Sequence, residues 1–346
     1  KAHKTGSTDP TSYTVGVLGQ RYFNAATGAT FECVGINDGA YTWTDKVGNL
    51  NSQLAALPGQ IKTNKNLLHN WDFRNPVNQR GLSSYTGNGA YTIDRYYANR
   101  LSVEIQSGYI RLIGLALSTG MPYFSQKIEN VASLNGKVVT MTIRYRTTSD
   151  KWVSGYYDGT YHTQAIPATA GAWAYYTHTF TVTTISTIPF GIHCTQDTED
   201  TIDIETVKLE LGSVSTLAND PPADFGEQLT LCQRYYKNSY SYGTLPGTAT
   251  TTGAFVNFIA STWYLNSPNI MFGSPMRISP TVTLYSTQNQ NTSGVVSECN
   301  TGSTFVADRA SVAASTTEKG FQVSASAGSY TAGNFVRFHW VASADL

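Results

Sequence analysis

The stretch Lys208–Asn238, KLELGSVSTLANDPPADFGEQLTLCQRYYKN, decides the fold of this chain. It opens as a β-strand that ends at Leu211-Gly212, and a polar linker with Pro221-Pro222 follows. We expect a short amphipathic helix over Glu227–Lys237, because apolar side chains recur there at every third or fourth position: Leu229, Cys232, Tyr235 and Tyr236. The stretch therefore leads from one β-rich region to the next.

The composition favours β-sheets and excludes a nucleic-acid partner. The chain has 346 residues, enough for two or three domains, and 13% of them are charged, about half the usual share. Lys plus Arg equals Asp plus Glu, at 23 each, so no basic field attracts nucleic acid. The 22 tyrosines, with many Thr, Ser, Gly and Asn, suit exposed sheets with polar turns. No apolar run approaches the roughly 20 residues that span a bilayer, so we expect no membrane insertion.

The first residue and the cysteines allow two further predictions, about the extent of the protein and about its disulfides. The chain starts at Lys1 without a methionine and shows no signal peptide, so we expect the C-terminal part of a longer protein. The four cysteines are isolated and lack metal-ligand spacing, which favours buried free thiols formed in a reducing cytoplasm over one or two long-range disulfides: Cys33, Cys194, Cys232 and Cys299.

The N-terminal quarter reads as a linker, a small β module and a neck. Residues 1–12 are polar and form the expected linker, and residues 47–65 form the neck. Residues 13–46 predict a three-stranded module with strands at Tyr13–Leu18, Thr30–Ile36 and Tyr41–Trp43, and a hairpin turn at Asn37-Asp38-Gly39. The neck carries a heptad spacing, which predicts either a short coiled coil or one amphipathic helix packed on its own domain: Val47, Leu50, Leu54, Leu57 and Ile61.

The rest of the chain predicts two β-sandwiches, so the fold class is all-β. Residues 66–212 form a jelly roll, residues 213–238 the linker and helix, and residues 239–346 a C-terminal sandwich, called here the tip module. The expected jelly-roll strands are Leu101–Gln106, Tyr109–Leu115, Tyr123–Lys127, Val138–Arg146, Trp152–Tyr157, Tyr175–Val182, Ile188–His193 and Ile202–Leu211. Those of the tip module are Phe255–Ser261, Ile270–Phe272, Thr281–Tyr285, Gly294–Ser297, Phe321–Ala325 and Phe335–Ala342.

Several of these segments resemble bacteriophage tail-fibre and receptor-binding proteins. The opening stretch is similar to a recurring segment of that family, and so are 66–80, NLLHNWDFRNPVNQR, and 91–98, YTIDRYYA. Segment 16–43 resembles small fibre modules that are similar to chitin-binding domains, and 334–346, NFVRFHWVASADL, resembles fibre tips. The resemblance implies a jelly roll like that of family 4/9-type carbohydrate-binding modules.

The resemblance also implies a function. It implies a homotrimer in the distal tail fibre of a virion, assembled in the bacterial host cytoplasm and attached to the rest of the tail or baseplate. The trimer would adsorb the virion to a bacterial surface polysaccharide or teichoic acid. A structural spacer without a ligand and a polysaccharide-degrading tail enzyme stay as alternatives. The sequence shows no Gly-x-Ser-x-Gly, His-Glu-x-x-His or phosphate-binding loop, so we expect a binding protein and no enzyme.

Two aromatic clusters are the candidate ligand sites. Aromatic rings stack on the apolar faces of sugars, and their polar ends donate hydrogen bonds. The first cluster lies in the loop KWVSGYYDGTYH and comprises Trp152, Tyr156, Tyr157, Asp158, Tyr161 and His162, unless Trp152 and Tyr156 instead face the core. The second lies in the tip module, beside long polar loops, and comprises Tyr240, Tyr242, Trp263 and Tyr264. The position of the tip at the end of a fibre favours the second cluster.

No cofactor is expected, with one open alternative. The acidic run Asp197–Glu205 stands out in a chain with so little charge. It predicts either a structural calcium site, with Asp72 as a further ligand, or a solvated turn before an edge strand.

Overall fold

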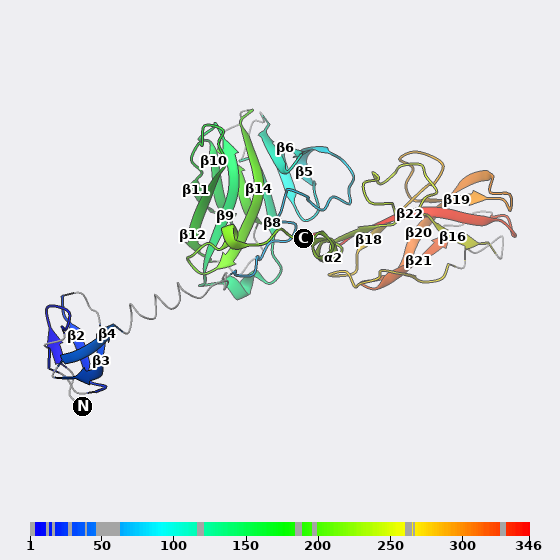
Figure 1. Cartoon of the computed structure of the whole chain (residues 1–346). Coiled ribbons are helices and arrows are strands. Elements are labelled where there is room, and N and C mark those ends of the chain that lie inside the picture. The colour runs from blue at the N-terminus through cyan, green and yellow to red at the C-terminus, as the bar shows by residue number, and fades with distance from the viewer. Residues whose placement is uncertain are drawn as a thin grey trace. The chain divides into compact units, whose positions relative to one another are not determined.

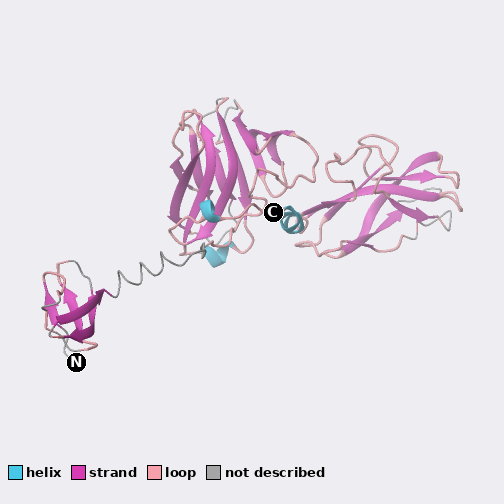
Figure 2. Cartoon of the chain, in the orientation of Figure 1, coloured by secondary structure: helices cyan, strands magenta, loops and turns pink. Residues whose placement is uncertain are grey.

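The protein is all-β and divides into two compact units, Lys1–Lys62 and Thr63–Leu346. A computed structural model describes residues 4–11, 14–15, 18–26, 30–38, 40–45, 63–115, 121–183, 189–195, 199–259, 265, 267–325 and 330–346. Strands dominate both units (Figures 1 and 2). The expected neck, with its heptad spacing over Val47–Ile61, lies outside the described residues. No helix in the described ranges is long and apolar enough to cross a membrane.

The first unit is a four-stranded sheet in which one strand was not expected. β2 pairs with β3 and β3 with β4 in antiparallel fashion, whereas β1 pairs with β2 in parallel. β1 falls within residues 1–12, so the prediction of a linker there is wrong for these residues. A strand of three residues has too little alternation to be recognised. The strands are β1 (Lys4–Gly6), β2 (Arg21–Asn24), β3 (Thr30–Asn37) and β4 (Ala40–Asp45).

Within the first expected strand of this unit, Tyr13–Leu18, the described residues Thr14, Val15 and Leu18 lie in no strand. They form a loop against β4 instead, since Trp43 Nε1 donates a hydrogen bond to the Thr14 carbonyl at 3.0 Å. The Trp43 ring also meets Tyr22 edge-on, at 5.7 Å between centroids. These contacts form the small core of the unit.

The second unit begins with a ten-stranded sheet that folds over itself. β6 joins its two halves, because residues 97–99 pair with β8 and residues 101–106 pair with β7. The order is β11-β10-β13-β8-β6-β7-β14-β9-β12, and β5 also pairs with β6. The strands are β5 (Ser84–Tyr91), β6 (Tyr97–Gln106), β7 (Tyr109–Gly114), β8 (Tyr123–Lys127), β9 (Val138–Thr147), β10 (Trp152–Tyr157), β11 (Tyr161–Ala165), β12 (Ala174–Thr181), β13 (Pro189–Cys194) and β14 (Thr201–Leu211).

The opening segment of this unit pairs irregularly with β14, through both backbone and side-chain hydrogen bonds. Asp72 forms an isolated bridge with Thr206 of β14, and the Asn66 side chain bonds the β14 backbone at Val207 and Leu209. The backbone N–H groups of Leu67 and Phe73 also donate to the carbonyls of Leu209 and Glu205, each at 2.8 Å. The segment still buries the Phe73 side chain in the core.

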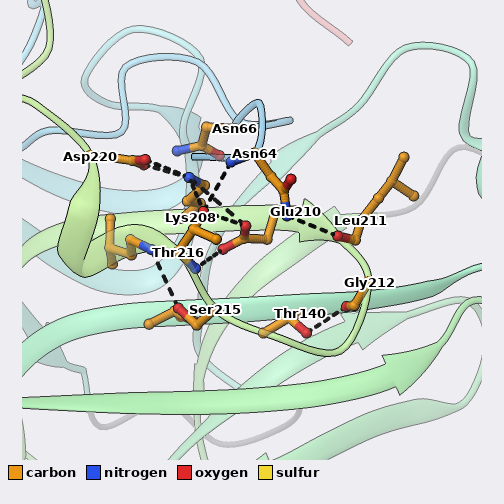
Figure 3. A network of polar contacts seen from close by, with 12 residues as sticks. Asn64, Asn66, Thr140, Lys208, Glu210, Leu211, Gly212, Ser215, Thr216 and Asp220 are labelled. Atoms are coloured by element: carbon orange, nitrogen blue, oxygen red, sulfur yellow. Dashed lines mark hydrogen bonds and ion pairs between the residues drawn. The ribbon is translucent and has the colours of Figure 1, made fainter. Parts of the chain in front are cut away.

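A buried charge network fixes the linker that follows β14 (Figure 3). Lys208 Nζ donates to both oxygens of Asp220, at 2.7 and 2.6 Å, and to Thr216 Oγ1 at 2.8 Å. Thr216 in turn donates its backbone N–H and its hydroxyl to the Glu210 carboxylate. Lys208 and Glu210 are fully buried, so each charge depends on these partners. The KLELG motif thus anchors the linker and the short 3₁₀ turn η2 (Leu217–Asn219).

The linker leads into α2 (Phe225–Cys232), which is shorter than the expected helix over Glu227–Lys237. The Asp224 side chain caps it by accepting a hydrogen bond from Glu227 N at 2.8 Å. Tyr235 lies beyond the helix end, and Tyr236 begins strand β15 (Tyr236–Asn238). The helix predicted from the spacing is wrong beyond Cys232, because Tyr236 and Lys237 instead pair with β22, which satisfies their backbone groups.

The tip module is a second sandwich built around its last strand, β22. β22 pairs with β15, β16, β18 and β19, and the order β15-β22-β19-β20-β21-β17 runs across the sheet. The long strand β20 was not expected. The strands are β16 (Phe255–Phe258), β17 (Ile270–Met271), β18 (Thr281–Tyr285), β19 (Val295–Cys299), β20 (Phe305–Thr317), β21 (Gly320–Ala325) and β22 (Phe335–Ser343).

The jelly roll and the tip module meet through stacked arginines. The Arg95 guanidinium lies 3.4 Å from the centroid of the Tyr235 ring, and that of Arg80 lies 3.9 Å from the centroid of Tyr236. Gln79 Nε2 adds a hydrogen bond to the Tyr236 carbonyl at 2.9 Å. The paired tyrosines therefore join two parts of one chain.

Candidate functional site

The β10–β11 hairpin presents two of the expected residues to solvent. Tyr157 and Tyr161 are each 41% exposed, and their ring centroids lie 4.6 Å apart. Trp152 and Tyr156 are 0% exposed, because alternate positions of β10 face the core. The expectation that these two contact a ligand is therefore corrected.

Asp158 and His162 shape the hairpin. Asp158 Oδ1 accepts a hydrogen bond from Thr160 N at 3.2 Å and lies 3.1 Å from His162 Nε2. The His162 ring stacks on Tyr156 with 4.4 Å between centroids, on the core side of the sheet. These two residues therefore position the tyrosines and are not the aromatic surface itself.

The two exposed tyrosines end a row of aromatic rings that crosses the sheet, called here the tyrosine track. From Tyr161 on β11 the row continues to His193 on β13 and Tyr123 on β8, with 5.8 and 5.9 Å between successive ring centroids. It then reaches Tyr97 on β6 and Tyr91 on β5, with 6.1 and 5.4 Å between centroids. The track thus spans six strands with rings in continuous contact. Its members are Tyr157, Tyr161, His193, Tyr123, Tyr97 and Tyr91.

The track exists because neighbours in sequence face opposite ways. Phe124, Ile192 and Ala98 belong to the core, so Tyr123, His193 and Tyr97 beside them point to the outer face. This outer face carries rings on one strand after another.

Glycines lower the sheet surface beneath the track. Gly155 pairs with Gly191, which pairs with Ser125. A Cβ added to Gly155 would lie 2.0 Å from the His162 carbonyl oxygen, and one at Gly191 would lie 2.1 Å from that of Phe124. Both positions therefore require glycine, and the residues beneath the rings are small.

Burial shifts the pKa values of two groups in the track. It lowers the pKa of His193 to about 4 and raises that of Tyr123. At the β5 end, the Arg80 guanidinium lies 5.4 Å from the centroid of the Tyr91 ring. The exposed tyrosines can offer ring faces and phenol hydroxyls, which suits stacking and hydrogen bonding.

The expected residues of the tip module have other roles. Tyr240 is buried, stacks on His339 at 3.9 Å, and accepts a hydrogen bond from Gly247 N. Tyr242 is exposed, but its hydroxyl accepts a hydrogen bond from Asn78 N at 2.7 Å, so it joins the tip module to the jelly roll. Trp263 and Tyr264 lie outside the described residues.

The acidic run forms ion pairs. Asp203 lies 2.7 Å from Arg111 Nε and 2.8 Å from Arg146 Nε, and Glu205 pairs with Arg144. Among the described residues, which exclude Asp197, no group of three His, Cys, Asp or Glu could hold a metal ion. These carboxylates therefore stabilise the sheet. The four cysteines are free and buried, as expected.

Sequence reasoning missed a second aromatic cluster, on the opposite outer face. The Arg146 guanidinium lies 4.9 Å from both the Tyr109 and the Trp173 rings, and Arg144 lies 5.5 Å from Trp173. The arginines already occupy these ring faces, so this cluster offers less free aromatic surface than the track.

Comparisons with known proteins add likenesses of fold. No family model and no curated protein matches the chain. The CBM22-1 xylan-binding domain from Paenibacillus barcinonensis Xyn10C matches with 14% identity over 44% of this chain and 99% of its own, at a TM-score of 0.29. A CBM4 structure matches with 16% identity over 37% of this chain and 85% of its own, at 0.27. The enzymatically active domain of bacteriophage CBA120 tailspike protein 4 matches with 12% identity over 42% of this chain and 21% of its own, at 0.29. At these identities and TM-scores, the likeness says nothing of the ligand of this chain.

Proposed function

We propose that this chain binds a glycan, and that the tyrosine track is its contact surface. The observation that carries the proposal is the row of six rings in contact across six strands. The apolar faces of sugar rings stack on aromatic faces, while phenol hydroxyls bond the sugar hydroxyls. An extended row fits a chain of sugars better than a single one.

In this proposal, the chain is part of a phage tail fibre that adsorbs the virion to a bacterial surface glycan. The motifs in segments 66–80, 91–98 and 208–238 support this setting. A homotrimer would place three tracks on one fibre, and linked sites raise avidity without new contacts. Free buried cysteines agree with assembly in the reducing cytoplasm of a host.

The proposed action is binding and not catalysis. Glycoside hydrolysis needs two carboxyl groups that flank the scissile bond. Along the described part of the track, Asp158 is already engaged by Thr160 and His162, and the strands beneath the rings carry Gly155, Gly191 and Ser125. These residues suit contact with a ligand better than bond cleavage.

A glycan array tests the proposal with the whole protein. The array should include neutral oligosaccharides, O-antigen polysaccharide and wall teichoic acid. Tyr157→Ala combined with Tyr161→Ala should abolish binding to every positive glycan. The matched control is Tyr175→Ala, which removes a 53% exposed tyrosine from the opposite outer face and should leave binding unchanged.

Two outcomes would overturn the proposal. Undiminished binding by the double variant would move the site away from the track. Release of shorter sugars during incubation with a positive polysaccharide would show an enzyme.

A further inference from the structure

His193, in the middle of the tyrosine track, is buried without a hydrogen-bond partner. Its exposed fraction is 1%, and neither Nδ1 nor Nε2 has a partner within the described part of the chain. An unsatisfied buried polar atom costs about 1–3 kcal/mol of stability, so such a group calls for a reason.

Two other buried histidines of the same chain do have hydrogen-bond partners. His339 has Ser239 Oγ 2.9 Å from Nδ1 and the Thr250 carbonyl 3.1 Å from Nε2. His178 Nδ1 lies 3.1 Å from the Ser154 carbonyl. His69 also has a buried Nδ1 without a partner, but among the described histidines it is His193 in which both nitrogens are buried and unpartnered.

Two tyrosine rings cover the imidazole. His193 pairs in register with Tyr123 of β8, whose ring centroid lies 5.9 Å away. The Tyr161 ring reaches His193 from β11, across β10, and meets it edge-on with an interplanar angle of 88°. On β10, His193 pairs with Val153 and Tyr161 pairs with Tyr157. Gly155 lies midway between these two partners and has no side chain, which leaves room for the ring to cross.

Tyr161 is the cover that can move. It lies on β11, the edge strand of the sheet, directly after the turn at Asp158-Gly159. The residue is 41% exposed, and its hydroxyl makes no hydrogen bond within the described part of the chain. Exposed side chains change rotamer within nanoseconds, so the ring can turn aside without movement of the backbone.

We propose that Tyr161 is a gate over His193, and that a hydroxyl of the bound glycan replaces its ring edge and hydrogen-bonds the imidazole. The inference rests on the proposed function and names the group that selects the ligand. A neutral imidazole has one N–H donor and one acceptor nitrogen, and a hydroxyl can match either.

This chemistry favours an uncharged sugar over a phosphorylated one. Because burial lowers the pKa of His193 to about 4, the ring carries no charge at pH 7. A phosphate or carboxylate would instead be held best by a charged donor. The ligand class is therefore a neutral polysaccharide, and teichoic acid is the weaker binder.

The test compares stability and binding in two apolar variants, His193→Phe and His193→Leu. Both remove the orphaned nitrogens, so the melting temperature of at least one should rise by about 2 °C or more. Affinity for the array-positive neutral oligosaccharide, measured by isothermal titration, should fall about fivefold to tenfold. His339→Phe is the matched control and should lower the melting temperature, because it deprives Ser239 and Thr250 of a partner.

The gate has its own readout, which needs no ligand. In the unmodified protein, diethylpyrocarbonate should label His193 only slowly, because the open rotamer is a minor state, and Tyr161→Ala should raise the labelling rate, measured by peptide mapping with mass spectrometry. An unchanged labelling rate would overturn the gate.

The outcomes also separate this inference from the proposed function. A lower melting temperature in both His193 variants would show that the ring is structural. Unchanged glycan affinity in both variants would show that the His193 imidazole makes no hydrogen bond to the ligand. Tighter binding of teichoic acid than of neutral sugars would reject a neutral polysaccharide as the ligand class. An array without any positive glycan would reject the proposed function, whatever the stability data show.

Discussion

Arg80 and Asp345 lie 265 positions apart in the sequence, yet Arg80 Nη2 lies 2.7 Å from Asp345 Oδ2. The pair joins the start of the jelly roll to the end of the tip module. Both side chains are largely buried, and the Arg80 guanidinium is also stacked on Tyr236. Removing one partner leaves an uncompensated charge in the junction.

Arg80→Ala should therefore cost about 3–5 kcal/mol of unfolding free energy. The two modules should also separate into two calorimetric transitions, because this arginine is one of their principal links. Differential scanning calorimetry measures both effects. Lys151→Ala removes an exposed pair with Asp150 and should change little. A single, unshifted transition for Arg80→Ala would contradict the expectation.

Asp94, beside this junction, should make stability depend on pH. Burial raises its pKa in the folded protein to about 6, from 3.8. Because the folded pKa exceeds the unfolded one, the stabilisation is complete below about pH 4 and is lost as the pH rises through 6. The loss amounts to roughly 3 kcal/mol.

Asp94→Asn should thus gain stability relative to the unmodified protein between pH 4 and pH 7. Urea denaturation at several pH values checks this, with the exposed Asp150→Asn as control. A difference between the two proteins that stays constant with pH would show that Asp94 does not titrate in this range.

The Lys208 network predicts a compensating pair of variants. Lys208→Met should destabilise the protein by about 3–5 kcal/mol, because it leaves the Glu210 and Asp220 carboxylates buried without their cation. Adding Glu210→Gln and Asp220→Asn should recover much of this loss. Chemical denaturation measures the three proteins. No recovery in the triple variant would mean that the lysine acts by packing and not by charge.

The oligomeric state is predicted to be a trimer. The heptad spacing Val47–Ile61 supports it, and exposed apolar side chains on the tip module, such as Phe258 and Met271, suit contacts between copies. Light scattering should give about three times the mass of one chain, 37.6 kDa. A mass of one chain at micromolar concentration would reject the trimer.

The sequence predicted most of the fold because strand alternation is a local property. The expected bounds of Tyr123–Lys127, Trp152–Tyr157 and Thr281–Tyr285 agree with β8, β10 and β18. β5 was missed, since Gly87 and Gly89 interrupt its alternation and coincide with irregular pairing. β11 was missed because it is short and its side chains lie at an exposed edge.

The site was predicted only in part because it depends on which strands become neighbours. Tyr157 and Tyr161 share one hairpin, so the local pattern pointed to them. Tyr123 and His193 reach the track through the order β10-β13-β8, which no local pattern encodes. The signal that was present is a tyrosine or histidine beside a core residue within a predicted strand.

The alternation of core and outer positions separates two kinds of evolutionary pressure. Phe124 and Ile192 fill the core, whereas Tyr123 and His193 beside them line the track. A substitution on the outer face alters the exposed surface and leaves the packed volume of the core unchanged. The same sandwich can therefore exchange its outer rings, and with them what it contacts, without first acquiring compensating changes inside.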